Sequence, residues 1–202
     1  MLVTITIRQF ILPLVAVMAA LGWAPIGSGV SAQTHGSPER FRAFAVDMGE
    51  WGTTRSGTLD FVVTRWSTKA EQEAILGALD EGQDAFVRAL ERTRRVGYIQ
   101  APSSVGWDLH YADVVEGEDG GRVVTLLTDR PIGVWESVNR PRSIEYPVTW
   151  IQLKLDKDGR GEGTMFEAAR VSGSLKHRFM VLENFATQGI RLMNVQSMSP
   201  AT

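Results

Sequence analysis

After Arg94 the chain has the pattern of short strands separated by turn residues, and this pattern constrains the fold more than any other feature. Runs of β-branched and aromatic residues bounded by Gly, Asp, Asn and Ser are typical of strands in an antiparallel sheet. Turn residues at 118–121, 156–159 and 187–189 predict three hairpins, so neighbouring strands should be antiparallel. The expected strands are residues 96–101, 107–116, 122–130, 148–155, 163–171, 179–185 and 190–196.

One amphipathic helix is expected before these strands, after a further alternating strand at residues 58–66. Thr68 and Glu71 fit a capping box, and an apolar stripe with three- and four-residue steps extends the helix over residues 68–93. A kink or break is expected at residues 80–82, where Gly82 follows poor helix formers. We therefore predict an α+β fold, in which a curved antiparallel sheet of about seven strands packs around one long helix. The stripe consists of Ile75, Leu79, Gly82, Phe86 and Leu90.

The first 32 residues have the pattern of a cleaved signal peptide. Arg8 precedes an apolar run, and Val30-Ser31-Ala32 places small residues at −3 and −1, so cleavage is expected before Gln33. The alternative is an uncleaved anchor, but a membrane-spanning helix needs about 20 apolar residues, and Pro and Gly interrupt this run. Residues 33–55 are expected to be a partly ordered leader and residues 56–198 a single domain, exported to the periplasm or secreted.

Charge and composition exclude several classes of protein. The chain has 21 basic and 23 acidic residues, and removal of Arg8 with the leader leaves 20 against 23, a balance of −3. Such a balance gives no basic surface for nucleic acid, so no nucleic-acid partner is expected. Cysteine is absent, which excludes disulfides, thiol nucleophiles and thiolate metal sites. No later apolar run approaches membrane length, so no membrane span is expected in the mature protein.

A histidine beside a carboxylate is the leading candidate for catalytic chemistry. If the 118–121 turn is symmetric, His110 lies opposite Asp129, with Arg130 next to the pair. A carboxylate partner orients an imidazole as a general base or a metal ligand would require. The alternative is a polar cross-strand pair on a solvated face, and a register slip of one residue would separate the two side chains.

Two stretches of the sequence partly resemble metal sites, but neither is expected to bind a metal, so no metal or cofactor is predicted. Residues 156–167 partly match a calcium loop, with Asp156 and Asp158 at its first ligand positions, but Arg160 replaces an oxygen ligand. A hairpin turn whose aspartates accept backbone hydrogen bonds is the favoured interpretation. A zinc site would require all three histidines, including His35 in the leader.

Large apolar side chains suggest binding surfaces, although most such residues in a small domain fill the core. Trp66 is one of the tryptophans that could line a pocket between sheet and helix. Trp135 lies in the polar connection at residues 131–147 with Glu136 beside it and Arg130 just before it. An aromatic residue among charged neighbours on a long loop is typical of a partner contact.

Four short runs resemble a group of small exported bacterial proteins of unknown function. They are Arg65-Trp66-Ser67-Thr68, Val96-Gly97-Tyr98-Ile99, Gly106-Trp107-Asp108-Leu109 and Thr128-Asp129-Arg130-Pro131. The resemblance implies an exported single domain and no particular activity.

Three functions fit these features. The leading hypothesis is a non-enzymatic exported binding protein for a small apolar ligand between helix and sheet, or for a protein partner at residues 131–147. The first alternative is a hydrolase or isomerase that uses His110 and Asp129. The second alternative is a structural, envelope-associated protein with no small ligand.

Overall fold

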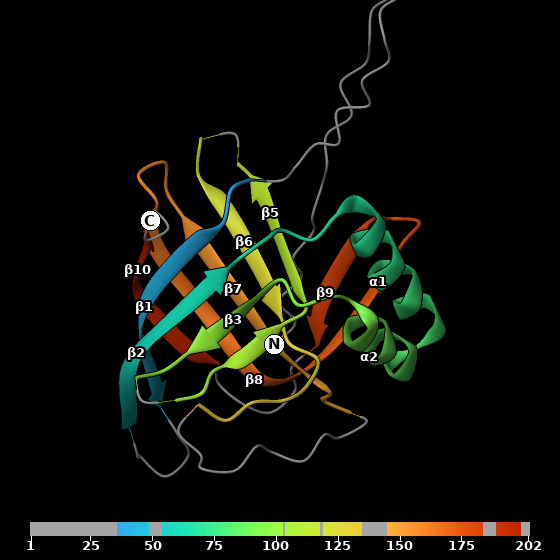
Figure 1. Cartoon of the computed structure of the whole chain (residues 1–202), viewed down its shortest axis with the longest axis horizontal. Helices are drawn as coiled ribbons and strands as arrows, with labels where there is room; N and C mark the ends of the chain where they lie inside the picture. The colour runs from blue at the N-terminus through green and yellow to red at the C-terminus, as the bar shows by residue number, and fades with distance from the viewer. Residues whose placement is uncertain are drawn as a thin grey trace, which may run out of the picture.

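Most of the described chain forms one antiparallel sheet. The computed structural model describes residues 36–48, 54–102, 104–117, 119–134, 145–183 and 189–198. Across the sheet the strand order is β4-β3-β2-β1-β10-β8-β7-β6-β5, and β9 pairs with β8 (Figure 1). The prediction of an antiparallel sheet is therefore confirmed. The elements are β1 Glu39–Met48, β2 Thr54–Val63, α1 Lys69–Glu81, α2 Gln83–Arg92, β3 Gly97–Gln100, β4 Trp107–Leu109, β5 Tyr111–Glu116, β6 Arg122–Leu127, β7 Val148–Leu155, β8 Arg160–Ser174, β9 Phe179–Glu183 and β10 Ile190–Met198.

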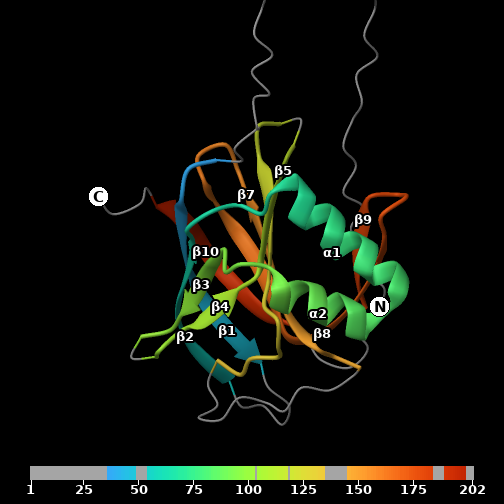
Figure 2. The ribbon, with the colours of Figure 1, turned by 45° about the vertical axis from the view of Figure 1, so that its right-hand side comes forward.

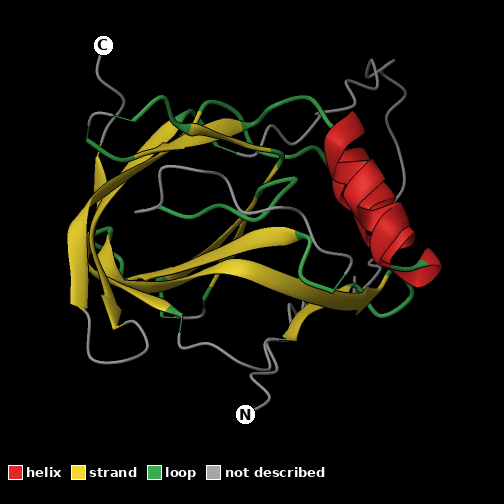
Figure 3. Cartoon of the chain, turned by 90° about the horizontal axis from the view of Figure 1, so that it is seen from below, coloured by secondary structure: helices red, strands yellow, loops and turns green. Residues whose placement is uncertain are grey.

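The sheet nearly closes on itself at His110. Strands β4 and β5 stand at opposite ends of the sheet order, yet only His110 separates them in the chain. Leu109 pairs with Gly97 of β3, whereas Tyr111 pairs with Leu127 of β6. One continuous extended segment thus pairs with β3 in its first part and with β6 in its second. Viewed from below, the strands curve into a barrel-like ring (Figure 3).

Ser67 completes the closure where β3 does not reach β5. Its backbone N–H donates to the Ala112 carbonyl at 2.9 Å, and its Oγ accepts the Ala112 N–H at 3.0 Å. Ser67 and Ala112 are both fully buried. A buried backbone N–H without a hydrogen-bond partner is energetically costly. Ser67 therefore supplies the hydrogen bonds to Ala112 that a neighbouring strand would otherwise provide.

Two hydrophobic clusters lie on the two faces of the sheet. The inner cluster fills the ring with side chains from facing strands, among them Phe41, Phe61 and Ile151. The outer cluster joins the helices to the sheet through residues such as Phe86 and Trp150. The helices therefore lie outside the ring, on the side of β5 and β9 (Figure 2).

The predicted fold, a sheet wrapped around one long helix, is wrong. The inward side chains of the strands fill the ring themselves, so the apolar stripe of the helices packs on the outer face. Strand β7 shows the consequence, since all but one of its eight residues are buried. A strand buried on both faces belongs to a sheet covered on both sides, here by other strands inside and by helices outside.

Two short helices replace the long helix that was predicted. Thr68 and Glu71 form the expected capping box at the start of α1. The helix stops at Gly82, whose φ of 111° is accessible to glycine without the strain that a side chain would bring. The break therefore falls within residues 80–82, where helix-breaking residues coincide.

Part of the segment predicted as a leader is a central strand. Strand β1 pairs with β2 on one side and with β10 on the other. Phe41, Ala43 and Ala45 alternate into the inner cluster, where all three are buried. Two of these three positions are alanines, so the period-two pattern is weak in the sequence.

The predicted hairpins at residues 118–121 and 156–159 form, since β5 pairs with β6 and β7 with β8. In the second turn, the Asp156 carboxylate accepts the N–H groups of Asp158 and Arg160 at 2.9 Å, as the turn interpretation predicts. The third predicted hairpin is wrong, because β9 and β10 both pair with β8 instead of with each other. A hairpin between β8 and β9 takes its place.

Both ends of the ring are occupied by side chains. At one end Arg122 pairs with Glu39 and lies 5.8 Å above the Phe41 ring. At the other end the fully buried Ile132 joins the inner cluster, and its N–H donates to Thr149 Oγ1 at 2.9 Å. Neither helix of the described chain has the length and apolarity needed to cross a lipid bilayer.

Candidate functional site

The structure brings His110 and Asp129 together at the closure of the sheet. The distance from His110 Nε2 to Asp129 Oδ1 is 4.0 Å, which is longer than a hydrogen bond. The Nδ1–H of His110 donates to the carbonyl of Thr93, the C-cap residue of α2, at 3.0 Å. In the neutral imidazole this leaves Nε2 as an acceptor that faces the carboxylate.

The predicted register of this hairpin is wrong by one residue. Tyr111 pairs with Leu127 and not with Thr128, because the turn is centred on Asp119, whose carboxylate accepts the Gly121 N–H. Asp129 nevertheless approaches His110, since it lies beyond the end of β6 and no longer follows the alternation of the strand.

Arg130 holds both oxygens of the Asp129 carboxylate. Its Nε and Nη2 donate to the two oxygens at 3.0 and 2.9 Å. The hydrogen bond and the charge of Asp129 raise the pKa of Arg130, burial opposes this, and Glu91 and Asp108 add to the rise. Asp129 is buried while Arg130 reaches solvent. The cluster is thus an ion pair beside a histidine, and it joins the end of α2 to the closure of the sheet.

The other predicted binding residues do not join this cluster. Trp66 lies in the inner core, where its Nε1 donates to the Ser37 carbonyl at 3.2 Å. Trp135 and Glu136 lie outside the described residues. Ile132, three residues before Trp135, is held by Thr149. The Thr149 Oγ1 accepts the Ile132 N–H and donates to the Glu167 carbonyl at 2.7 Å.

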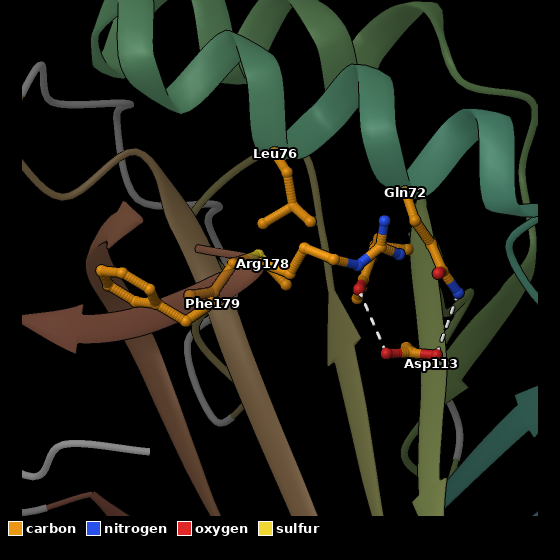
Figure 4. Close-up of a pocket in the computed structure, with 7 residues that line it drawn as sticks. Gln72, Leu76, Asp113, Arg178 and Phe179 are labelled. Atoms are coloured by element: carbon orange, nitrogen blue, oxygen red, sulfur yellow. Dashed lines mark hydrogen bonds between the residues drawn. The ribbon is translucent and has the colours of Figure 1, made fainter. Parts of the chain in front are cut away.

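A separate polar pocket lies on the outer face between α1, β5 and the β8–β9 turn (Figure 4). Gln72 and Leu76 face it from successive turns of α1. Tyr111 and Asp113 face it from the same side of β5. The lining is completed by Arg178 of the β8–β9 turn and by the first two residues of β9, Phe179 and Met180.

Asp113 is the acceptor at the floor of this pocket. Gln72 Nε2 donates to it at 2.9 Å and the Tyr111 hydroxyl at 3.4 Å. Burial raises the pKa of Tyr111 well above its usual 10.0, the charge and hydrogen bond of Asp113 raise it further, and Arg178 opposes the rise. The phenol is therefore a neutral donor at neutral pH.

The Gln72 amide is fixed by two acceptors. Its Nε2 also donates to the Ser67 carbonyl at 3.3 Å, so the two acceptors fix the orientation of the amide group. The amide oxygen lies on the side that Arg178 covers (Figure 4). Gln72 is polar but buried, as expected of a side chain that hydrogen bonds hold in place.

Arg178 covers the mouth of the pocket. Its φ of 49° is a left-handed conformation that is uncommon outside glycine. Its Nη1 lies 3.3 Å from Glu73 Oε1, and the two side chains are 35% and 45% exposed. Such a surface pair is weak and is screened by salt. A competing anion can therefore displace Glu73 at little cost.

The pocket has room for a group the size of water. The cavity volume is about 20 Å³, whereas one water needs roughly 10–15 Å³. The space therefore accepts a small head group of one or two non-hydrogen atoms, with the remainder of a ligand at the mouth. Its lining combines the oxygen acceptors of Asp113 and Gln72 with the apolar side chains of Leu76, Phe179 and Met180.

Sequence reasoning missed this pocket because its residues come from three separate elements. The usable signal was Gln72, a polar residue at a position of the helical stripe that Leu76 and Leu79 share. A second signal was Asp113, which lies two residues after a buried tyrosine on the same face of a strand.

Within the described ranges no group of three or more histidine, aspartate or glutamate side chains is arranged to hold a metal ion. Comparisons of the chain with protein-family models, with curated proteins and with solved structures found no match.

Proposed function

We propose that this chain is a binding protein whose small polar ligand enters the pocket above Asp113. One observation carries the proposal: the Asp113 carboxylate and the Gln72 amide, whose Nε2 donates to Asp113 and to Ser67, face a water-sized space covered by a weakly paired arginine. Pre-positioned acceptors of this kind hold a ligand without a cost of rearrangement on binding. A few fixed polar groups beside apolar walls are the usual composition of a ligand site.

A polar ligand is favoured over the apolar ligand expected from the tryptophans. Trp150 and Phe86 belong to the outer cluster, and Trp66 belongs to the inner cluster. These aromatic residues therefore pack against protein side chains. The pocket described above is instead lined by Gln72, Asp113 and Arg178, together with their apolar neighbours.

Binding is favoured over catalysis in this pocket. Among the described contacts, Asp113 accepts hydrogen bonds from Gln72 and Tyr111, and Tyr111 stays protonated because its pKa is raised. General acid–base chemistry needs groups that exchange protons near the working pH. The enzyme hypothesis for His110 and Asp129 stays a prediction. It requires that His110→Ala abolish an activity while the fold is retained.

The proposal is tested by saturation-transfer NMR with a mixture of small amines, amino acids, carboxylic acids and sugars. In the Gln72→Lys variant an ammonium group of the protein itself would occupy the pocket beside Asp113. The matched control is Ala74→Lys, which adds the same charge at an exposed position of α1. We expect at least one class of compound to bind the wild type and Ala74→Lys but not Gln72→Lys. Absence of any signal, or signals that Gln72→Lys retains, would contradict the proposal.

Export also stays a proposal, supported by the leader pattern at residues 1–32 and by the resemblance to exported proteins. Expression of the full chain in a bacterium, followed by fractionation and mass spectrometry, tests it. We expect a chain that begins at Gln33 outside the cytoplasm. A chain that retains Met1 in the cytoplasm would refute export.

A further inference from the structure

We propose that the ligand is a small zwitterion in which a primary ammonium and a carboxylate are one or two carbons apart, as in a free amino acid. This inference rests on the proposed function, since it names the ligand of the same pocket. The arrangement has an anionic floor at Asp113 and a cationic cover at Arg178. A ligand with both charges matches both groups.

The ammonium group fits the floor by size and by hydrogen bonding. A primary ammonium has three N–H donors and no acceptor. The pocket supplies acceptors at the Asp113 carboxylate and the Gln72 amide oxygen, and the Tyr111 hydroxyl oxygen adds a third. Water and ammonium are of similar size, so the volume that admits one or two waters admits this group. A quaternary ammonium, with four carbon substituents, is too large.

The carboxylate of the ligand fits the mouth. Arg178 presents its guanidinium there, and its partner Glu73 is a half-exposed carboxylate on α1. A ligand carboxylate replaces Glu73 by the same chemistry, and two parallel N–H donors of a guanidinium can hold both of its oxygens. Displacement of Glu73 also returns that side chain to water, where it is well solvated.

The apolar wall limits the rest of the molecule. Leu76, Phe179 and Met180 are the apolar residues of the lining, and Leu76 and Phe179 lie away from Asp113 (Figure 4). Burial of apolar surface against these residues favours a short aliphatic substituent over a charged one. The preferred probe is therefore L-alanine.

Isothermal titration calorimetry with four probes tests the inference. L-Alanine carries both charges, ethylamine only the ammonium, propionate only the carboxylate, and N-acetyl-L-alanine has its amine blocked. We expect L-alanine to bind most tightly, ethylamine at least tenfold more weakly, and the other two not at all. The probes thereby separate the contribution of the ammonium from that of the carboxylate.

Two variants test which charged residue of the pocket binds which charge of the ligand. Asp113→Asn should weaken L-alanine at least tenfold, since it removes the charge that pairs with the ammonium. Arg178→Gln should weaken L-alanine severalfold and leave ethylamine unchanged. The control is Asp80→Asn, an exposed change of the same kind on α1, which should alter neither. Circular dichroism establishes that each variant is folded.

The outcomes separate this inference from the proposed function. Equal affinities for L-alanine and ethylamine, both lowered by Asp113→Asn, would overturn the zwitterion and retain the pocket as a site for an amine, such as a lysine side chain. Propionate binding as tightly as L-alanine would also overturn it. Failure of all four probes on the wild type would overturn it, while the proposed function would still be judged by the wider mixture and the Gln72→Lys variant.

Discussion

Substitution of Ser67 by alanine tests how the sheet is closed. The change removes the Oγ that accepts the Ala112 N–H at 3.0 Å, while the bond from the Ser67 N–H to the Ala112 carbonyl can remain. Ala112 is fully buried, so its N–H loses its partner where water cannot replace it. An unsatisfied buried donor costs about 1–3 kcal/mol. For a domain of this size the loss corresponds to a fall in melting temperature of roughly 2 to 12 °C.

Urea denaturation measures this loss, with an unchanged dependence on denaturant concentration because the surface exposed on unfolding stays the same. Hydrogen exchange provides a local readout, and the Ala112 amide should lose protection more than the other amides of β5. The control is Ser56→Ala, an exposed serine of β2, which should change stability by less than about 0.5 kcal/mol. Equal stabilities of Ser67→Ala and Ser56→Ala would refute the role given to Ser67.

Two predictions concern pH. Burial raises the pKa of Glu71, but the hydrogen bonds from Arg65 and from the Thr68 N–H outweigh it and hold the pKa below its usual 4.5. A carboxyl with a lowered folded-state pKa stabilises the fold above its unfolded-state value and loses this effect as pH falls. Glu71→Gln should therefore cost about 0.5 kcal/mol at pH 7 through loss of the ion pair with Arg65, and its difference from wild type in urea denaturation should narrow below pH 4.5. A constant difference across this range would be inconsistent with the cap. Tyr111 has a raised pKa, so its contribution is present below pH 10 and is lost as pH rises above it. Tyr111→Phe should lack the fall in stability that the wild type shows between about pH 10 and 11, as measured by denaturant melts, and an equal fall in both would argue against burial of the phenol.

Local patterns predicted several elements because short-range chemistry decides them. Strand β7 has the predicted bounds, and Thr68 and Glu71 form the predicted capping box. The break between the helices falls at Gly82, within the segment of poor helix formers. Side-chain capping and backbone preferences act within a few residues, so a single sequence contains enough information for them.

The closure of the sheet depends on contacts that no local pattern contains. Residues 107–116 have the pattern of one strand. In the structure, however, the part before His110 pairs with β3 and the part after it pairs with β6. The strands β3 and β6 lie at distant positions in the sequence. The apolar stripe of the helices is the same whether it packs inside a curved sheet or on its outer face. The patterns of the strands and of the helical stripe therefore could not distinguish a sheet wrapped around the helix from a sheet with the helices on its outer face.

The candidate site shows the same limit. The predicted pair of His110 and Asp129 comes together even though its predicted register is wrong, because Asp129 lies beyond the strand. Gln72, Asp113 and Arg178 come from a helix, a strand and a turn that are 41 or more residues apart, and only the packing of α1 on the sheet brings them together.

The most direct test of the central claim is a ¹H–¹⁵N NMR titration of the folded protein with L-alanine, observed at the side-chain amide of Gln72. This amide donates to both Asp113 and Ser67, so it reports any group that enters the pocket. We predict a saturable shift of the Gln72 Nε2 signals, accompanied by the Arg178 Nε signal and absent in Asp113→Asn. Saturable shifts confined to residues away from α1, β5 and the β8–β9 turn, or no saturable shift, would contradict the claim.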